Sequence, residues 1–596
     1  MRIVVLNVLL SLYAICSISQ QSPIILGAGN QEDIVVTSSS TEEGTLPDNT
    51  LQNVGLLPNP AAASRFLAHA TLGANLETID LAAAAGFSDW IEEQFQLTDE
   101  FSVEDYTKFI TKWALDSTYT IGGNPEDVQP QLRYWHFAWW QYTMNSPELL
   151  KNRIALALSE ILVISELPQL RDVPLALANY YDLLRAHSFG NFRELLEAVT
   201  LHPAMGVYLT HMNNPKSNAS LNRFPDENYA REVMQLFTIG LYELNQDGSR
   251  KILADGVTPI PTYDNEDIQE FAKIFTGLTW GDAFLFGQRP QSELSYTQPM
   301  MMDDFWHEPG EKILLNGAIV PDRNPVDGLA DIRVALDNLF NHPNVGPFIG
   351  HKLIQRLVTS NPSPDYIERV AAAFNNNGAG VRGDMKAVIK AILLDEEARQ
   401  CPREDEALQG MLREPMVRYA HVSRAFDARS VEGTYRNAMD NFYESNFQRP
   451  LASPSVFNFF QPTYQPIGGI EENGLVAPEF QILNSVSIMG YANEVHDWIM
   501  RDFRVMEYKS IFSGEASTDD KRVNLDLSDE INLGESNDLD ELIERIDLLL
   551  THGQMTDRTK SIIKEAVANY PENKSYLKGR LAIYLTLISP DYLILK

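Results

Sequence analysis

Residues 147–162, with the sequence PELLKNRIALALSEIL, decide the fold class of this chain. After Pro147 and Glu148, apolar side chains fall on nearly every side of the stretch when it is wound at about 3.6 residues per turn. A helix that is apolar all round has no face suited to water and belongs in a protein interior. We therefore expect a buried helix here.

The helical spacing of apolar residues recurs along the chain after residue 60. Asp264 and Asp267 are spaced as a capping arrangement at the start of one helix, and Gly277 stands where a left-handed cap would end it. The predicted fold is mainly α, a multi-helix globular assembly with long irregular insertions and one or two short β-hairpins. The clearest further helical stretches are 61–70, 77–95, 192–199 and 344–358.

Two insertions interrupt the helical pattern. Residues 242–263 contain a turn signal at Asp247-Gly248, and residues 284–321 are loop-like with a predicted hairpin over Lys312–Val320. Long irregular segments on a rigid scaffold often carry binding and catalytic residues. The insertions are therefore the first places to look for a functional site.

The first 20 residues have the layout of an export signal. Arg2 is the only early charge, an apolar run extends from Ile3 to Ile15, and small residues follow it. We predict that residues 1–20 are a signal peptide and that the protein is exported to the periplasm, the cell surface or the extracellular space. Lipidation at Cys16 is the alternative, but the residues just before it are not the small ones that a lipoprotein signal requires.

The rest of the chain is predicted to have three parts. Residues 21–59 are rich in Ser, Thr, Gly, Gln and Asn and are expected to form a disordered leader. Residues 60–400 form a main helical domain that contains both insertions, and residues 401–596 form a C-terminal, mainly helical region packed on it. No stretch after the signal is long and uncharged enough to span a bilayer, so we expect no transmembrane anchor.

Charge and cysteine content limit the partners and the cross-links. There are 47 Lys and Arg against 81 Asp and Glu, which gives a net charge of -34. Such a surface repels phosphate backbones, so nucleic acid is not expected as a partner, whereas cations, basic proteins and neutral ligands stay open. Removal of the signal leaves Cys401 as the one remaining cysteine, which precludes an intrachain disulfide.

Familiar catalytic motifs are absent from the sequence. It contains no G-x-S-x-G elbow, no Gly-rich phosphate loop, no H-E-x-x-H and no C-x-x-C. Two constellations of polar residues remain as candidate sites.

The first constellation is the predicted helix 226–240, with the sequence DENYAREVMQLFTIG. Glu227 and Arg231 can pair along its surface, and Glu232 lies in a polar column with Asn228 at the edge of the apolar stripe. A half-buried carboxylate needs a partner, a proton or a metal. One interpretation is that Glu232 bridges helices by bonding to an arginine or a tyrosine. The other is a catalytic acid or metal ligand at Glu232, with Asn228 and Arg231 as binding residues. The arginines available for the first interpretation are Arg153, Arg185 and Arg193.

The second constellation is 303–312, DDFWHEPGEK, in the longer insertion. Asp304, His307 and Glu308 offer oxygen and imidazole ligands that suit a divalent cation, the one cofactor that the sequence suggests. His307 and Glu308 could instead share proton transfer, with Trp306 and Lys312 as binding residues. The alternative is a solvated acidic loop held in place by Trp306.

The stretch from Pro225 to Gly240 resembles the signature of the bacterial domain-of-unknown-function 1800 family, whose usual form reads Asn-Glu-Asn-Tyr-Ala-Arg-Glu-Leu-Met-Glu-Leu-Phe-Thr-Leu-Gly. The resemblance implies an exported, mostly helical bacterial protein, often encoded beside a secreted partner of a sulfatase-like family. It implies no activity and no cofactor. Many members have Trp-His-Asn-His where this chain has Leu158-Ser159-Glu160-Ile161. Segments that agree in the same order are 63–73, 189–205, 263–277, the turn at His307, 349–353 and 589–593.

Two classes of function are therefore compatible with the sequence. The first is an extracytoplasmic binding or assembly protein that acts with a secreted sulfatase-like partner on surface polymers. The second is a metal-dependent or acid/base hydrolase of cell-surface or extracellular material that uses Glu232, His307 and Glu308. The hydrolase hypothesis requires the helix at Glu232 and the turn at His307 to converge on one cleft.

Overall fold

The computed structural model describes residues 59–98, 100–120, 131–399, 410–501, 509–512, 515 and 518–596. The predicted signal peptide, the predicted leader up to residue 58 and Cys401 lie outside these residues. Within the described ranges, no helix is both long enough and apolar enough to cross a membrane.

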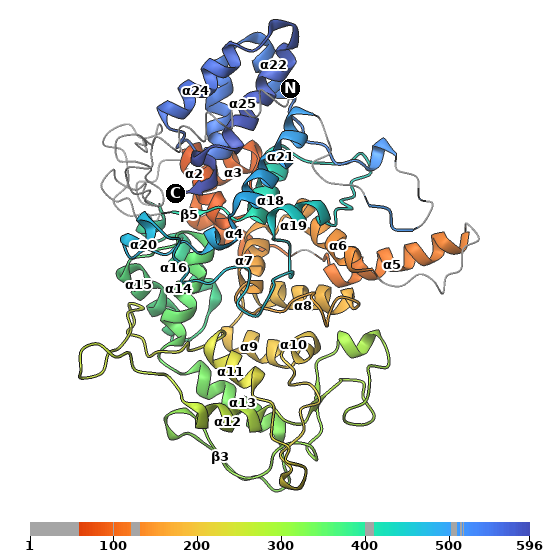
Figure 1. Cartoon of the computed structure of the whole chain (residues 1–596), viewed down its shortest axis with the longest axis vertical. Coiled ribbons are helices and arrows are strands. Elements are labelled where there is room, and N and C mark those ends of the chain that lie inside the picture. The colour runs from red at the N-terminus through yellow and green to blue at the C-terminus, as the bar shows by residue number, and fades with distance from the viewer. Residues whose placement is uncertain are drawn as a thin grey trace.

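The fold is mainly α, as predicted, and helices α11–α13 lie at the opposite end of the long axis from α22–α25 (Figure 1). Up to residue 399 the helices are α2 (Pro60–Ala70), α3 (Leu76–Ala85), α4 (Phe87–Gln96), α5 (Val103–Thr120), α6 (Leu132–Asn145), α7 (Leu149–Ser159), α8 (Pro174–His187), α9 (Phe192–Thr200), α10 (Pro203–Tyr208), α11 (Asn228–Gln235), α12 (Asn265–Ile274), α13 (Gly328–Phe340), α14 (Val345–Leu357), α15 (Pro364–Asn375), α16 (Met385–Leu393) and α17 (Glu396–Arg399). From residue 410 they are α18 (Pro415–Ala425), α19 (Asp440–Asn446), α20 (Gly469–Glu472), α21 (Ser485–Met500), α22 (Ser528–Ser536), α23 (Leu539–Ile546), α24 (Asp557–Ala568), α25 (Lys578–Leu587) and α26 (Pro590–Leu593).

The strands of the described residues form three antiparallel pairs. The predicted hairpin over Lys312–Val320 is confirmed, because Lys312 pairs with Val320 and Ile313 with Ile319. The third pair joins the segment after residue 410 to the end of the chain. The strands are β1 (Leu278–Thr279) with β2 (Met301–Met302), β3 (Lys312–Ile313) with β4 (Ile319–Val320), and β5 (Met411–Leu412) with β6 (Ile594–Leu595).

Helix α7 is buried, as its all-round apolar sequence predicts. Nine of its 11 residues are buried, and it packs against α2, α4, α8 and α14. It ends at Ser159, three residues before the end of the stretch 147–162. The hydrophobic core around it contains residues from both sides of residue 400, among them Phe66, Leu156, Tyr419 and Leu587.

The capping prediction for helix α12 is confirmed at its start and wrong at its end. Asp264 and Asp267 form a capping box in which each side chain accepts a hydrogen bond from the other residue's backbone N–H. The helix ends at Ile274, and Gly277 lies beyond its cap, with φ +87°. A side chain at Gly277 would collide with the backbone of Asp303 and His307, so the glycine allows the second constellation to pack against the end of α12.

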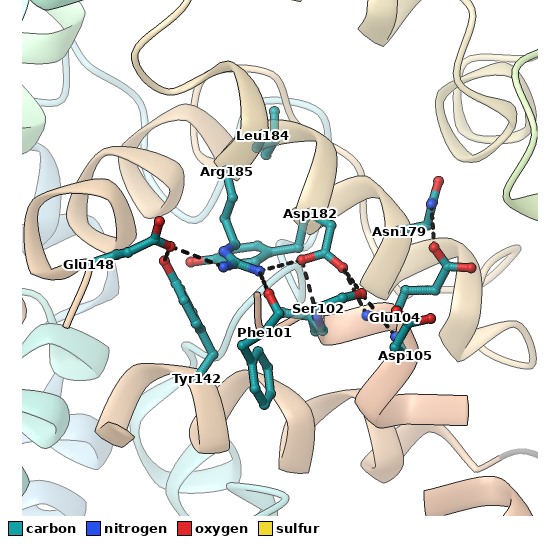
Figure 2. A network of polar contacts seen from close by, with 12 residues as sticks. Phe101, Ser102, Glu104, Asp105, Tyr142, Glu148, Asn179, Asp182, Leu184 and Arg185 are labelled. Atoms are coloured by element: carbon teal, nitrogen blue, oxygen red, sulfur yellow. Dashed lines mark hydrogen bonds and ion pairs between the residues drawn. The ribbon is translucent and has the colours of Figure 1, made fainter. Parts of the chain in front are cut away.

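A buried ion-pair network connects α5, α6 and α8 (Figure 2). Asp182 of α8 accepts hydrogen bonds from the backbone N–H groups of Val103 (3.1 Å) and Glu104 (2.9 Å), so its charge lies at the N-terminus of α5, where the helix dipole stabilises an anion. Arg185, one turn later on α8, donates to Asp182 (2.5 Å) and to Glu148 (3.2 Å). Both acids therefore have partners within this network.

Three buried glutamates connect segments from either side of residue 400. Gln448 donates hydrogen bonds to Glu160 (3.2 Å) and Glu414 (2.5 Å), and Arg356 Nε lies 3.4 Å from a carboxyl oxygen of Glu160. Burial, and then the charge of Glu414, raises the pKa of Glu160 well above its usual range. The same two causes raise the pKa of Glu479 to about 8. Glu479 therefore binds a proton near neutral pH.

The substitution Glu479→Gln tests this protonation. Because the pKa of Glu479 is higher in the folded than in the unfolded chain, the folded state binds more protons, and its stability falls as the pH rises from about 4.5 to about 8. Glutamine mimics the protonated acid and does not titrate. The variant should therefore gain free energy of unfolding over the wild type, more near pH 8 than near pH 4.5, in denaturant titrations. An equal difference at the two pH values would contradict the burial of an ionisable Glu479.

Candidate functional site

Helix α11 is the shorter, observed form of the predicted helix 226–240. Tyr229 and Val233 of its apolar stripe are fully buried, and the Tyr229 ring stacks on His211 with centroids 3.9 Å apart. The helix stops at Gln235, because the chain then turns, with the backbone N–H groups of Ile239 and Gly240 both bonded to the carbonyl oxygen of Met234. The predicted extension to residue 240 is therefore wrong.

Glu232 lies at the edge of the core, as its position on α11 predicts, and is 6% exposed. Eleven acidic side chains are buried in the part of the chain that the structure describes. Ten of them have a hydrogen bond or ion pair, whereas Glu232 has none, and its Oε2 is enclosed without a partner. The ten are Glu148, Glu160, Glu166, Asp331, Asp395, Glu414, Glu479, Glu530, Asp547 and Asp591.

The arginine interpretation of Glu232 is wrong. Arg153 donates to the carbonyl oxygen of Arg356, and Arg185 belongs to the network of Figure 2. Arg193 binds Asp337 at 2.6 Å and Glu197 at 2.9 Å. None of the three reaches Glu232.

The charged neighbours of Glu232 come from α11 itself and from α14. Burial raises the pKa of Glu232, and the charges of Arg231 and Lys352 offset this only in part. Burial lowers the pKa of Lys352 to about 7, with Arg356 adding to the effect and Glu232 opposing it. Lys352 Nζ donates to the carbonyl oxygen of Leu236, 2.7 Å away, at the C-terminal end of α11. Among the residues that the structure describes, no ion pair joins Lys352 to Glu232.

The charge of Glu232 also acts on two half-buried tyrosines. Burial, with the charge of Glu232 adding to it, raises the pKa of Tyr208 to about 12. Burial also raises the pKa of Tyr263 to about 12, with Arg231 opposing and Glu232 adding to the effect. The hydroxyl of Tyr263 is enclosed and has no hydrogen-bond partner. We call Glu232, Lys352, Tyr208 and Tyr263 the Glu232 site.

Asn228 and Arg231, the predicted binding residues of α11, lie on its outer side. Arg231 pairs with Glu227 at 3.3 Å, as the spacing predicts, and both side chains are more than 40% exposed. Asn228 Nδ2 lies 3.4 Å from Thr210 Oγ1. An exposed pair of this kind contributes only about 0.3–0.5 kcal/mol to stability.

His307 is fully buried and belongs to a different cluster. Its Nδ1 donates to the carbonyl oxygen of Thr276 at 2.9 Å, and its Nε2 lies 3.2 Å from Asp331 Oδ2. Lys312 Nζ binds the same Asp331 oxygen at 2.7 Å, and Arg323 binds the other oxygen at 2.8 Å. Burial alone would raise the pKa of Asp331, but hydrogen bonds from His307, Lys312 and Arg323 outweigh it and hold the pKa at about 2.

The other predicted metal ligands each have a separate partner. Asp304 accepts a hydrogen bond at 2.9 Å from the backbone N–H of Gly328, the first residue of α13. Glu308 accepts bonds from the backbone and hydroxyl of Ser217, at 2.6 and 2.7 Å. Across the described ranges, no three His, Cys, Asp or Glu side chains are grouped so that they could hold a metal ion. In this structure Asp304, His307 and Glu308 instead connect the insertion to its neighbours.

The two constellations have separate surroundings. The groups that act on Glu232 are Arg231, Lys352 and the two tyrosines, whereas His307 contacts Thr276, Asp331 and Lys312. In the described chain these two sets share no residue. A joint site of Glu232 and His307 therefore has no support from the contacts.

Sequence reasoning missed Lys352, Tyr208, Tyr263 and Asp331. Lys352 lies in a stretch recognised only as an apolar helix and as a segment shared with the family, and it is 120 positions away from Glu232. The available signal was a basic residue within 344–358, where the other side chains are mostly apolar. Sequence spacing alone could not pair it with Glu232.

The substitution Asp331→Asn tests the structural role of the His307 cluster. It leaves the buried ammonium of Lys312 without a carboxylate, so we expect a loss of about 3–5 kcal/mol in the free energy of unfolding. The pKa of Asp331 is depressed in the folded state, so its contribution is present above about pH 4 and is lost as the pH falls towards 2. The variant should therefore lose less stability than the wild type over that range, measured by denaturant titration.

The control is Asp337→Asn on the same helix. Asp337 pairs with Arg193 but is 59% exposed, so its loss should cost at most about 1 kcal/mol. Equal effects of the two substitutions would contradict a buried, structural Asp331.

Comparisons with known proteins agree with the resemblance at residues 225–240. No curated protein and no solved structure matches the chain. The family described as "Protein of unknown function (DUF1800)" matches residues 65–594. Because this match spans nearly the whole chain, the protein belongs to the DUF1800 family.

Proposed function

We propose that this chain is an exported binding protein that docks a secreted partner protein through the exposed apolar side chains around Trp306. The surface consists of Phe224, Phe284, Leu285 and Phe305, which are 70–89% exposed, and we call it the Trp306 surface. The observation that carries the proposal is this concentration of exposed apolar groups.

Trp306 holds the surface together. Its ring stacks on Phe286, with centroids 4.9 Å apart and planes 18° apart, and Phe305 meets it edge-on at 5.4 Å. Phe284 is two residues from Phe286 in the chain. Phe224 follows Arg223, whose guanidinium lies 5.5 Å from the Trp306 ring. Phe305 therefore contacts Trp306 directly, and the other three exposed residues lie one or two positions along the chain from a residue that does.

The exposed apolar side chains are unevenly distributed. Of the 26 large hydrophobic side chains that are exposed in the described residues, 13 lie between Leu221 and Ile319. Single exposed apolar residues are normal, but a contiguous group marks an interaction surface, because its burial by a partner releases water from apolar area. Rigid aromatic groups such as these often dominate the energy of protein–protein interfaces.

Two cations lie beside the aromatic rings of the Trp306 surface. Lys216 Nζ lies 4.6 Å from the Phe305 ring, and Arg223 flanks Trp306. These cations lie at the apolar surface of a chain whose net charge is -34. Complementary charge at the rim orients a partner and speeds association.

Export and the class of partner complete the proposal. The N-terminal sequence supports export, and the family resemblance supports a secreted sulfatase-like protein as the partner. The proposed role is to position that partner on surface polymers.

The hydrolase alternative has one observation in its favour, the buried and unpaired carboxyl of Glu232. His307 and Glu308 lie in structural contacts of their own. Acid/base chemistry at Glu232 would therefore use Lys352 as the second group.

The double substitution Phe284→Ser/Leu285→Ser tests the docking proposal. Both side chains are more than 70% exposed, so the melting temperature should stay unchanged while binding weakens at least about tenfold. The measurement is capture of proteins from the envelope fraction of the native cell on immobilised protein, followed by titration of the captured sulfatase-like protein.

The matched control is Val431→Ser/Ile467→Ser, which removes two side chains that are 84% and 96% exposed outside the Trp306 surface. It should leave capture unchanged. Equal capture by both double variants and the wild type would refute docking through the Trp306 surface.

A further inference from the structure

We infer that a row of aromatic side chains along α5 binds a linear, electrically neutral glycan chain. The row consists of Tyr106, Phe109 and Trp113, and we call it the α5 ladder. None of these residues belongs to the Trp306 surface, so the inference does not depend on docking there.

The three rings of the α5 ladder follow one another along one side of the helix. Their positions are three and four residues apart, which places them on neighbouring turns. The ring centroids of Tyr106 and Phe109 are 5.8 Å apart, and those of Phe109 and Trp113 are 5.9 Å apart. The ladder is therefore a contiguous surface.

The α5 ladder faces solvent on a helix that is anchored by its other side. Val103 and Ala114 are fully buried on that other side, and α5 packs against α6 and α8. Phe109 is 55% exposed, and Tyr106 and Trp113 are half-buried. Helix α5 reaches out from one side of the molecule (Figure 1). A long ligand can therefore lie across the rings without any opening of the fold.

The outer rings of the α5 ladder are held in place by neighbouring segments. The hydroxyl of Tyr106 donates to Gln141 of α6 at 3.3 Å. The guanidinium of Arg436, which pairs with Glu515, lies 4.5 Å from the centroid of the Trp113 ring. Rings that are ordered before binding lose little conformational freedom when a ligand stacks on them.

The charges of α5 favour a neutral ligand. Both lysines of the helix already have carboxylate partners on it, because Lys108 pairs with Glu104, and Lys112 with Asp116 at 2.5 Å. They therefore do not offer an acidic polymer an open cation. An acidic polymer would also be repelled by a chain whose net charge is -34. A neutral polymer meets neither obstacle.

Sugar units match the shape and the chemistry of the α5 ladder. The face of an aromatic ring is electronegative, and it attracts the C–H groups on the flat apolar face of a sugar. The centroid spacings of 5.8 and 5.9 Å are close to the length of one sugar unit in a linear chain, so successive rings can stack on successive units. Exposed Lys112 and Asp116, one and two turns from Phe109, can bond to hydroxyl groups at the edges of the chain.

Isothermal titration calorimetry with cellohexaose, maltohexaose and chitohexaose tests the inference on the protein without its predicted signal peptide. At least one hexasaccharide should bind, and more tightly than its own disaccharide, because the ladder has three rings. Phe109→Ala should weaken binding at least about tenfold. Its melting temperature should change little, since the side chain is more than half exposed. The matched control is Phe457→Ala, which removes a ring that is 44% exposed elsewhere and should leave binding unchanged.

The remaining outcomes separate this site from other uses of the rings. The variant Phe284→Ser/Leu285→Ser should bind the same hexasaccharide as tightly as the wild type. Absence of binding by all three hexasaccharides, or equal binding by Phe109→Ala and the wild type, would overturn the inference. Tighter binding of a galacturonic acid hexasaccharide would contradict the preference for a neutral chain. Dimerisation in sedimentation experiments that Phe109→Ala abolishes would instead assign the ladder to a contact between two copies.

Discussion

The structure depends on one constraint, the cost of removing ionisable groups from water. The described core contains eleven acidic side chains, and the sequence leaves no intrachain disulfide to hold the helices once the predicted signal is removed. Buried charges connect the helices instead. Asp182 and Arg185 join α5 to α8, Gln448 bridges Glu160 and Glu414 across residue 400, and Asp331 holds the longer insertion to α13.

The cost of burying an ionisable group helps to distinguish polar side chains with a structural role from those with a functional one. His307 and Glu308 look catalytic in the sequence, yet their hydrogen bonds go to neighbouring loops and helices. Glu232 looks like a half-buried structural acid, yet it has no partner. The functional hypotheses therefore rest on what the fold leaves unsatisfied: an enclosed carboxyl on α11 and an apolar surface around Trp306.

Local features of the fold could be predicted from sequence, and long-range ones could not. Periodicity located the buried helix α7, the capping box at Asp264 and the hairpin at Lys312, because these depend on residues a few positions apart. It also placed Glu232 at the edge of the core. The partners of His307 and the approach of Lys352 to α11 depend on how distant helices pack, which spacing within one helix does not encode. The early end of α11 depends on the turn to Gly240 that packs against α14.

The central claim is that Glu232 is a desolvated carboxyl without a counter-ion. Its side-chain ¹³C resonance, assigned by difference from Glu232→Gln in protein labelled at glutamate, reports its titration directly. The account predicts a midpoint above the ordinary value of 4.5, because burial outweighs the charges of Arg231 and Lys352. A midpoint at or below 4.5 would contradict it, since the carboxylate would then be solvated or paired.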